Sequence, residues 1–243
     1  PSQKVITCED PVEYVIDGIV QCTVDTEAGR TFGESLRAIV RQDPDTIVVG
    51  EIRDKTTASL AVEAALTGHK VFSTFHTEES VRACVRLLEM GIDPFLVSST
   101  VSAVVAQRLV RLLCPDCKVP SRPTAEELRF LKVSRSDLND VELFGPGGCE
   151  KCGAVGYKGR IAIHEVLIPN DEFREAVFAR ANAGQLRKLA RTLPEFCSMQ
   201  EDGLIKAMSG LTSLAETIAN APRDTEPRPM SVLRGISRSW RAS

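Results

Sequence analysis

The sequence has no apolar run that approaches the ~20 residues needed to cross a bilayer, and no signal peptide is visible in it. It also lacks an excess of one charge. The net charge is −3, which gives no electrostatic argument for binding nucleic acid or an acidic membrane surface. An initiator methionine is missing, since the first residue is Pro1 and the chain opens on a strand-like segment. We therefore expect a fragment whose beginning is absent.

What is present is typical of a globular protein. The chain has 243 residues, of which 26% are charged, and this length suffices for a buried core in one large domain or a domain with a satellite. Apolar runs predict strands at residues 4–7, 14–24, 46–49 and 70–74. Helices are predicted at 31–42, 55–66 and 81–91, with another from Pro94 that buries Val97, Val101, Val104 and Val105. The alternation predicts an α/β fold with parallel strands.

Polar residues follow two of these strands. Residues 41–54 read RQDPDTIVVGEIRD, so the strand runs directly into Gly50 and Glu51, and residues 67–77 read TGHKVFSTFHT, which places His76 just after the other. Open α/β sheets bind ligands, often phosphates, beyond the carboxyl ends of their strands. A carboxylate there can bind Mg²⁺ and orient an attacking water, and a neutral imidazole can donate to a γ-phosphate.

Simpler roles compete with this interpretation. Glu51 could form a salt bridge with Arg53, which follows it closely, and His69 could equally well satisfy a backbone group. Glu13, which lies beyond the strand at residues 4–7, is the most plausible second carboxylate.

Eight cysteines are present, and four of them form two C-x₂-C pairs, Cys114 with Cys117 and Cys149 with Cys152. Thiolate softness and tetrahedral geometry favour a structural Zn²⁺ held by all four. Redox pairs and unmetallated thiols remain alternatives. The other cysteines have no paired spacing and are predicted to be small core residues: Cys8, Cys22, Cys84 and Cys197.

Composition divides the chain further. The character changes near Leu112, where cysteines, prolines and glycines become frequent. We expect a core at residues 1–111, a tetracysteine element at 112–160, a strand with a helical subdomain at 161–220, and a disordered basic tail at 221–243.

Several segments together resemble the type II secretion and type IV pilus assembly ATPases. They are EDPVEY at 9–14, similar to the aspartate box; residues 41–54, similar to Walker B; ALTGH at 65–69 with STFHT at 73–77, similar to the histidine box; QRLVRLLCPDC at 107–117; and GYKGR at 156–160. The resemblance is dense from residue 6 to 167 and looser to about 220.

The resemblance implies a RecA-like P-loop NTPase core, truncated at its amino end, with an inserted zinc element and a C-terminal helical subdomain. It implies a homohexameric ATPase on the cytoplasmic face of the bacterial inner membrane. Such a ring uses ATP and Mg²⁺, works with inner-membrane platform and cytoplasmic adaptor proteins, and binds no nucleic acid. Carried over by motif, the catalytic set is Glu51, Glu13, His76, His69 and Arg53.

One departure from the family pattern is large. No Gly-Lys dipeptide occurs in the chain, so the phosphate-binding loop G-x-x-x-x-G-K-[S/T] is absent and this piece alone is predicted to be inactive. Ring ATPases also use arginine fingers, but no finger can be assigned among Arg37, Arg41, Arg53, Arg82, Arg86, Arg108 and Arg111. A non-catalytic, zinc-stabilised ring scaffold is the rival function, and a DNA-processing enzyme is a third.

Overall fold

The protein is described from a computed structural model that covers residues 3–25, 28–224 and 227–242. The chain divides into two compact units. The first unit contains Pro1–Val104 and Ile168–Leu193, and the second contains Val105–Leu167 and Pro194–Ser243. This division differs from the expected boundaries, because helices that were assigned to a C-terminal subdomain belong to the first unit.

The first unit is built on a four-stranded sheet with the order β2-β1-β3-β4. Its strands are β1 (Val5–Glu9), β2 (Val20–Thr23), β3 (Thr46–Val49) and β4 (Lys70–Ser73), and every pairing is parallel. In the register Ile6 lies beside Ile47, and Val49 beside Ser73. The predicted α/β class with parallel strands is confirmed.

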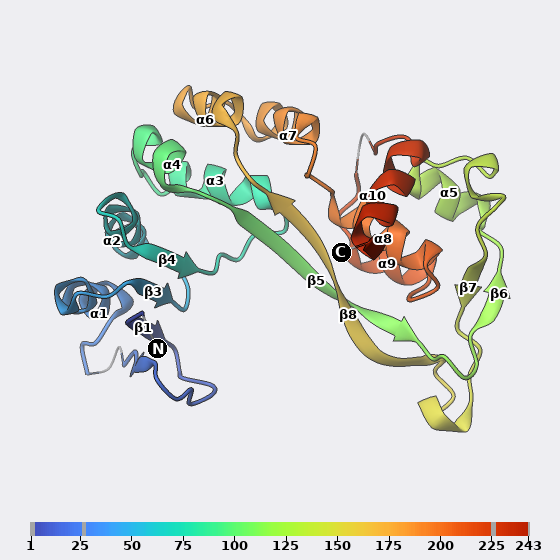
Figure 1. Ribbon diagram of the computed structural model, residues 1–243, viewed down its shortest axis with the longest axis horizontal. Coiled ribbons are helices and arrows are strands. Elements are labelled where there is room, and N and C mark those ends of the chain that lie inside the picture. Colours follow the sequence, from blue (N-terminus) through green and yellow to red (C-terminus); the bar gives the residue numbers. More distant parts are fainter. Residues whose placement is uncertain (1–2, 26–27, 225–226, 243) are drawn as a thin grey trace. The chain divides into compact units, whose positions relative to one another are not determined.

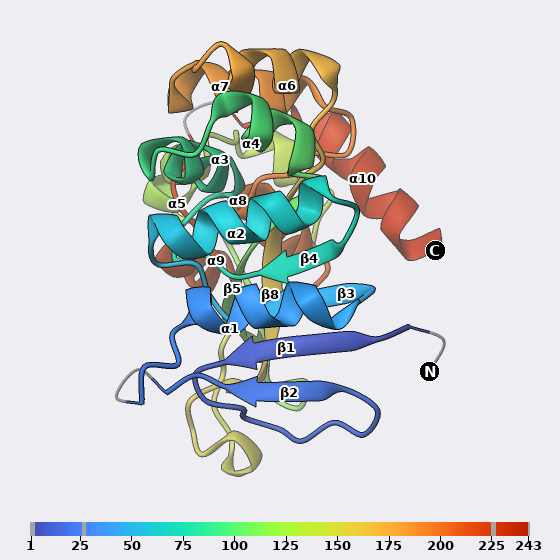
Figure 2. The same cartoon turned by 90° about the vertical axis from the view of Figure 1, so that its left-hand side faces the viewer.

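Helices α1 (Phe32–Ile39) and α2 (Lys55–Leu66) cover one face of this sheet (Figure 2). Thr31 caps α1 through a reciprocal capping box with Glu34, as the sequence predicts, and the helix continues into the short 3-10 helix η1 (Val40–Gln42). The side chains of Cys8, Ile47 and Val49 lie at register positions that share one face, and all three are fully buried.

Four more helices complete the first unit: α3 (Ser80–Glu89), α4 (Pro94–Thr100), α6 (Asp171–Phe178) and α7 (Ala183–Thr192). Although far apart in sequence, α4 packs on α6 and α3 packs on α7 (Figure 1). Arg174 donates to the carbonyl of Ser98, and Arg187 pairs with Glu79, so the later helices are tied to the earlier ones by polar contacts.

The helix expected from Pro94 is shorter than predicted. It ends at Thr100, and Val104 and Val105 lie in strand β5 (Val104–Leu113), where Val105 is 59% exposed. β-branched valines favour extended backbone, and the segment finds a partner strand, so tertiary pairing overrides the helical spacing of these residues.

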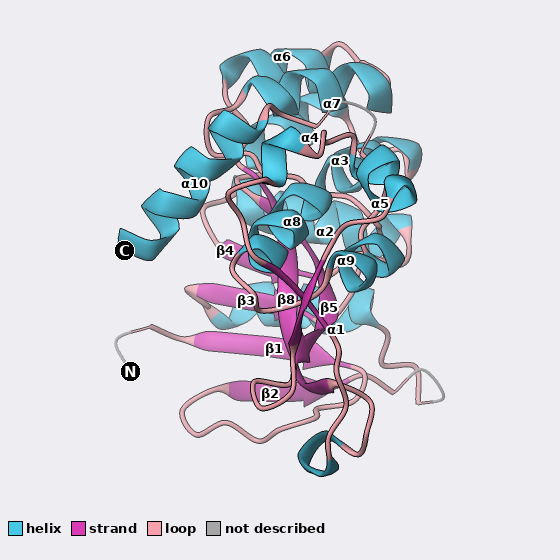
Figure 3. Cartoon of the chain, turned by 90° about the vertical axis from the view of Figure 1, so that its right-hand side faces the viewer, coloured by secondary structure: helices cyan, strands magenta, loops and turns pink. Residues whose placement is uncertain are grey.

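The second unit pairs β5 with β8 (Tyr157–Leu167) (Figures 1 and 3). It also pairs β6 (Val119–Ser121) with β7 (Leu143–Gly145) in antiparallel fashion (Figure 1). Its helices are α5 (Ala125–Leu131), α8 (Met199–Met208), α9 (Leu214–Asn220) and α10 (Met230–Ala242), with the 3-10 helices η2 (Ser136–Leu138) and η3 (Glu150–Cys152). Leu131, Leu204 and Leu233 lie together in its core. No helix among the described residues is both long enough and apolar enough to span a bilayer.

The expectation of a disordered tail is wrong for residues 230–242, which form α10. Met230 and Leu233 are buried, and Ile236 packs beside them, so the apolar residues repeat every three positions along one helical face. Arg228 and Arg234 pair with Glu201 and Asp140. Two of the arginines that suggested a solvated tail therefore neutralise acids of the same unit.

Candidate functional site

The carboxyl edge of the parallel sheet gathers the polar residues that follow β1, β3 and β4. Because the strands are parallel, Glu9 at the end of β1, Glu51 after β3 and Thr74 after β4 leave the sheet at the same edge. Gly50 continues the pairing, since its N–H donates to the carbonyl of Cys8 at 2.8 Å. A β-carbon on Gly50 would lie 3.1 Å from that same oxygen, which explains why the position suits glycine.

Glu51 contacts two side chains at this edge. Nε2 of His76 lies 3.1 Å from Oε2 of Glu51, and Arg53 forms an ion pair with Oε1. The Glu51 side chain is 13% exposed, whereas His76 is 87% and Arg53 63% exposed. The carboxylate is therefore mostly covered, and its partners face solvent.

The Arg53 guanidinium holds the pKa of the Glu51 carboxyl below its usual range, an effect that burial opposes and His76 reinforces. Glu51 is consequently ionised at neutral pH. The sequence-based alternative of a Glu51–Arg53 salt bridge is present, and it coexists with the contact to His76 instead of replacing it.

Thr74 holds the backbone on both sides of Glu51. Its hydroxyl donates to the carbonyl of Gly50 at 2.7 Å, and its own carbonyl accepts from the N–H of Ile52 at 3.1 Å. Residues 50–52 are thereby joined to the end of β4. The sequence motif at residues 73–77 includes Thr74, but no role was predicted for it. Its position directly after a strand and two residues before His76 could have indicated that its hydroxyl lies at the same site.

Glu13 lies on the loop that follows β1 and forms no direct bond with Glu51 in the described part of the chain. Glu13 is exposed on the loop between β1 and β2, and no hydrogen bond or ion pair among the described residues joins it to Glu51 or His76. The carboxylate at the end of β1 is Glu9, which accepts from the Thr7 hydroxyl and from Nε2 of Gln21 at 3.0 Å. Sequence reasoning overlooked Glu9, which lies in the same short motif.

His69 lies at the opposite edge of the sheet, directly before β4. Its Nδ1 is 2.9 Å from the carbonyl of Ala64 and 3.2 Å from the hydroxyl of Thr67. The ring is thus tied to the last turn of α2. Of the two histidines singled out from the sequence, His76 joins Glu51, and His69 satisfies a backbone group.

Besides Arg53, two of the arginines considered as fingers make ion pairs within their own unit. Arg111 pairs with Glu216 at 2.6 Å and lies over the ring of Tyr157, and Arg86 pairs with Glu89 at 3.6 Å. Both contacts are of the structural kind.

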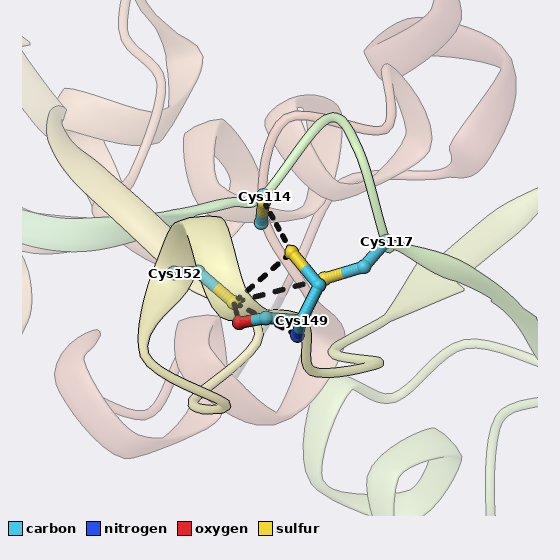
Figure 4. Close-up of side chains that lie close together, drawn as sticks. All are labelled: Cys114, Cys117, Cys149 and Cys152. Carbon is cyan, nitrogen blue, oxygen red and sulfur yellow. Dashed lines mark hydrogen bonds between the residues drawn. The ribbon is translucent and has the colours of Figure 1, made fainter.

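The four paired cysteines converge on one point in the second unit (Figure 4). Their sulfur atoms all lie within 4.8 Å of one another, with separations of 3.9 Å for Cys114–Cys149, 3.8 Å for Cys117–Cys152 and 3.7 Å for Cys149–Cys152. Tetrahedral Zn–S bonds of about 2.3 Å place sulfurs about 3.8 Å apart. The four thiols, which form no disulfide, therefore match the spacing of a zinc site.

Backbone N–H groups converge on the same sulfurs. Gly148 donates to Cys117 Sγ at 3.2 Å, and Cys149 and Gly156 donate to Cys152 Sγ at 3.3 and 3.2 Å. The Cys149 and Gly156 donors outweigh burial and lower the pKa of the Cys152 thiol to about 6. Such donors stabilise a thiolate, which is the form that binds a metal.

The unpaired cysteines are distributed as predicted, with one exception. Cys8, Cys84 and Cys197 are buried, and burial raises their thiol pKa values. Cys22 is only half-buried.

Comparison with known proteins agrees with the motifs. The family described as "Type II/IV secretion system protein" matches residues 1–219. The chain is 48% identical over 219 residues to the type IV pilus assembly ATPase PilB of Thermus thermophilus, covering 90% of this chain and 24% of that protein. It is 46% identical over 217 residues to the type II secretion system ATPase E of Vibrio cholerae, covering 89% and 42%. The chain thus spans less than half the length of these relatives.

Solved structures show the same likeness. The pilus retraction motor PilT, determined with bound ADP, superimposes with a TM-score of 0.65 at 25% identity, covering 92% of this chain and 53% of that one. The Legionella pneumophila ATPase DotB shares the fold, with a TM-score of 0.61 at 24% identity, covering 88% and 50%. On the family match, the sequence identities and the coverage, this chain belongs to the type II/IV secretion system protein family.

Proposed function

We propose that the whole protein containing this chain is an ATPase that drives protein secretion or the assembly of a type IV pilus or pseudopilus. The chain forms part of its RecA-like motor domain. The observation that carries this proposal is the contact between Glu51 and His76 at the carboxyl edge of a parallel sheet. The names of the PilB and type II ATPase E relatives, and the bound ADP of PilT, support it.

The residues at the sheet edge suit Mg²⁺ and a triphosphate. Glu51 supplies an ionised carboxylate, the hard oxygen ligand that Mg²⁺ prefers. Gly50, which precedes it, has no side chain that would block the access of the ion and the phosphates. When bound, Mg²⁺–ATP supplies the phosphoryl group for hydrolysis. Glu51 would bind the ion and orient the attacking water, and the exposed imidazole of His76 would donate to the terminal phosphate.

The other three residues of the catalytic set take less direct roles in this proposal. Arg53 keeps Glu51 ionised and oriented. Glu13, which lies on the β1–β2 loop, supplies a second carboxylate that helps to activate the attacking water. His69 acts as a positioning residue, because it anchors the start of β4 to α2.

Thr74 is expected to position Glu51. In the whole protein, Thr74→Val removes the hydroxyl donor to Gly50 but keeps the shape of the side chain, and one hydrogen bond of about 1 kcal/mol corresponds to a factor of roughly five. We expect turnover to fall by about three- to tenfold, and the melting temperature to fall by only about 2–4 °C. Thr74→Ser, which keeps the hydroxyl, should turn over ATP almost normally. Equal rates for the valine variant and the unmodified protein would remove this role from Thr74.

The 243-residue chain by itself is expected to show no ATP turnover and only weak binding. It contains no Gly-Lys dipeptide, so it supplies neither the backbone cradle nor the lysine that grip the phosphates in P-loop enzymes. Phosphate release and nucleotide binding by the purified chain test this expectation. Turnover that disappears in the Glu51→Gln variant of the same chain would show that the expectation is wrong.

The four-cysteine cluster is proposed to hold a structural Zn²⁺. All four ligands are thiolates, so the coordination shell is closed and no position remains for a reacting molecule. The ion would join the turn at Cys114 and Cys117 to the turn at Cys149 and Cys152, which Asp116 and Lys151 already bridge by an ion pair of 2.6 Å. Its contribution is to folding.

The assembly is proposed from the resemblance of the motifs to the type II secretion and type IV pilus assembly ATPases. We infer that the whole protein works as a homohexamer on the cytoplasmic face of a bacterial inner membrane, where platform and adaptor proteins of a secretion or pilus machine bind it. The mass of the whole protein with and without nucleotide, measured by light scattering, tests the ring. A scaffold subunit that assembles the ring without hydrolysing ATP is the rival function, and the effect of Glu51→Gln on turnover separates the two.

A further inference from the structure

The loop between β1 and β2 carries Glu13, and little apolar packing holds this loop in place. Its three consecutive apolar side chains, Tyr14, Val15 and Ile16, are 80%, 90% and 51% exposed. Burial of apolar surface, which fixes most segments of a folded protein, therefore contributes little here. The position of the loop depends on polar contacts instead.

Gln21 supplies those contacts from the neighbouring strand β2. Its Oε1 accepts from the N–H of Ile16 at 2.8 Å, and its Nε2 donates to the carbonyl of Tyr14 at 3.0 Å. In the described part of the chain, the one other hydrogen bond of residues 11–17 is a turn, in which the N–H of Ile19 donates to the carbonyl of Ile16 at 3.3 Å. Among the described residues, the Gln21 amide thus makes the hydrogen bonds that tie this loop to the sheet.

The same amide also holds the end of β1. Nε2 of Gln21 donates to Oε1 of Glu9 at 3.0 Å, and that oxygen accepts from the Thr7 hydroxyl as well. Gln21 lies beside Thr7 in the register of the two strands, so the three side chains share one face of the sheet. The Tyr14 carbonyl and the Glu9 carboxylate are therefore held around one nitrogen atom, which folds the loop back beside the end of β1.

A primary amide suits this set of partners. It offers two N–H donors and one carbonyl acceptor, and at Gln21 both donors face acceptors while the acceptor faces a backbone N–H. A carboxylate at this position would meet the Glu9 carboxylate with a like charge, and a thioether would make none of the three bonds. The contacts therefore depend on the chemistry of glutamine and not only on the size of its side chain.

We propose that Gln21 is a positioning residue that holds Glu13 for its part in hydrolysis. Glu13 directly precedes Tyr14, so the bond to the Tyr14 carbonyl restrains the backbone next to it. Because β1 and β3 are parallel neighbours, the restrained loop begins at the same edge of the sheet as Glu51. Without the bonds from Gln21 the loop can swing away from that edge, and its carboxylate is then correctly placed for less of the time. This role rests on the function proposed above, in which Glu13 helps to activate the attacking water.

Turnover by the whole protein tests this role through a double-mutant cycle. Gln21→Met keeps the length of the side chain but makes none of the three hydrogen bonds, and it should lower kcat by about tenfold while the KM for ATP changes little. In a Glu13→Gln background the same substitution should lower kcat by less than about twofold, because the position of residue 13 matters only while it carries the carboxylate. A merely structural role would give the same factor in both backgrounds.

A control variant and a structural measurement complete the test. Thr23→Val replaces an exposed polar side chain of the same strand, so it should keep normal turnover. Amide hydrogen exchange of Ile16, measured on the 243-residue chain, should become about three- to tenfold faster in Gln21→Met. Exchange of Gly50, whose N–H donates to Cys8 within the sheet, should stay the same.

The possible outcomes separate this role from the proposed function. In a protein that Glu51→Gln inactivates, normal turnover by Gln21→Met or equal factors in the two backgrounds would refute the positioning role and leave the proposed function standing. Unchanged exchange at Ile16 would show that the Gln21 amide does not hold the loop. Full turnover by Glu51→Gln would remove the proposed function and, with it, the part of Gln21 in hydrolysis.

Discussion

Glu51→Gln in the whole protein is expected to lower ATP turnover by roughly 10²–10⁴-fold, the range typical of losing a group that assists proton transfer. Glutamine keeps the size of the side chain but removes the negative charge that Arg53 and His76 contact. Nucleotide binding should be preserved, because the phosphates are gripped elsewhere in P-loop enzymes. Turnover and nucleotide affinity, measured on the same preparation, check both expectations.

Glu63→Gln is the matched control for this variant. Glu63 is an exposed acid on α2, so the same change there alters the net charge equally without touching the sheet edge. Normal turnover by Glu51→Gln would remove the proposed role of Glu51, and the ring would then be a scaffold at this site.

The same assay distinguishes the two acids near the end of β1. If Glu13 assists the attacking water, Glu13→Gln lowers turnover and leaves the melting temperature unchanged, since the side chain is exposed. Glu9→Gln should instead lower stability, because Glu9 accepts from Thr7 and Gln21. A loss of turnover in Glu9→Gln alone would transfer the role of second carboxylate to Glu9.

Removing zinc is expected to destabilise the second unit strongly. The binding free energy of a structural zinc is also folding free energy, so the loss should amount to several kcal/mol. Since 1 kcal/mol corresponds to about 2–4 °C for a chain of this size, the melting temperature should fall by about 10 °C or more. Metal analysis should find one zinc per chain, and Cys149→Ser or a strong chelator should remove it. A zinc-free protein with an unchanged melting temperature would refute the structural role.

Three further variants separate ligand loss from general damage. Cys22→Ser changes a cysteine outside the cluster and should keep the zinc. Gly147→Ala would place its β-carbon 1.9 Å from the carbonyl oxygen of Cys117, which forces the turn to move and should weaken zinc binding. Gly153→Ala meets no atom within 4 Å, so its effect is limited to the cost of a positive φ, about 1–2 kcal/mol.

Local structure and the composition of the candidate sites could be predicted from the sequence. Thr31, Thr124 and Ser213 cap the helices that follow them, and each cap depends only on a hydrogen bond from the backbone N–H three positions further along the chain. We could also recognise the two cysteine pairs and the polar residues Glu51 and His76 that follow strands. A strand or a C-x₂-C turn is specified within a few residues. In each case neighbours in sequence are neighbours in space.

Contacts between distant residues were decided by the tertiary structure. The sequence marked Glu51 and His76, 25 residues apart, as candidates, and the parallel pairing of β3 with β4 placed them in contact while it put His69 at the other edge. Packing also drew residues 168–193 into the first unit and turned a predicted tail into α10. These outcomes depend on which surfaces bury one another, and a short window of sequence does not contain that information.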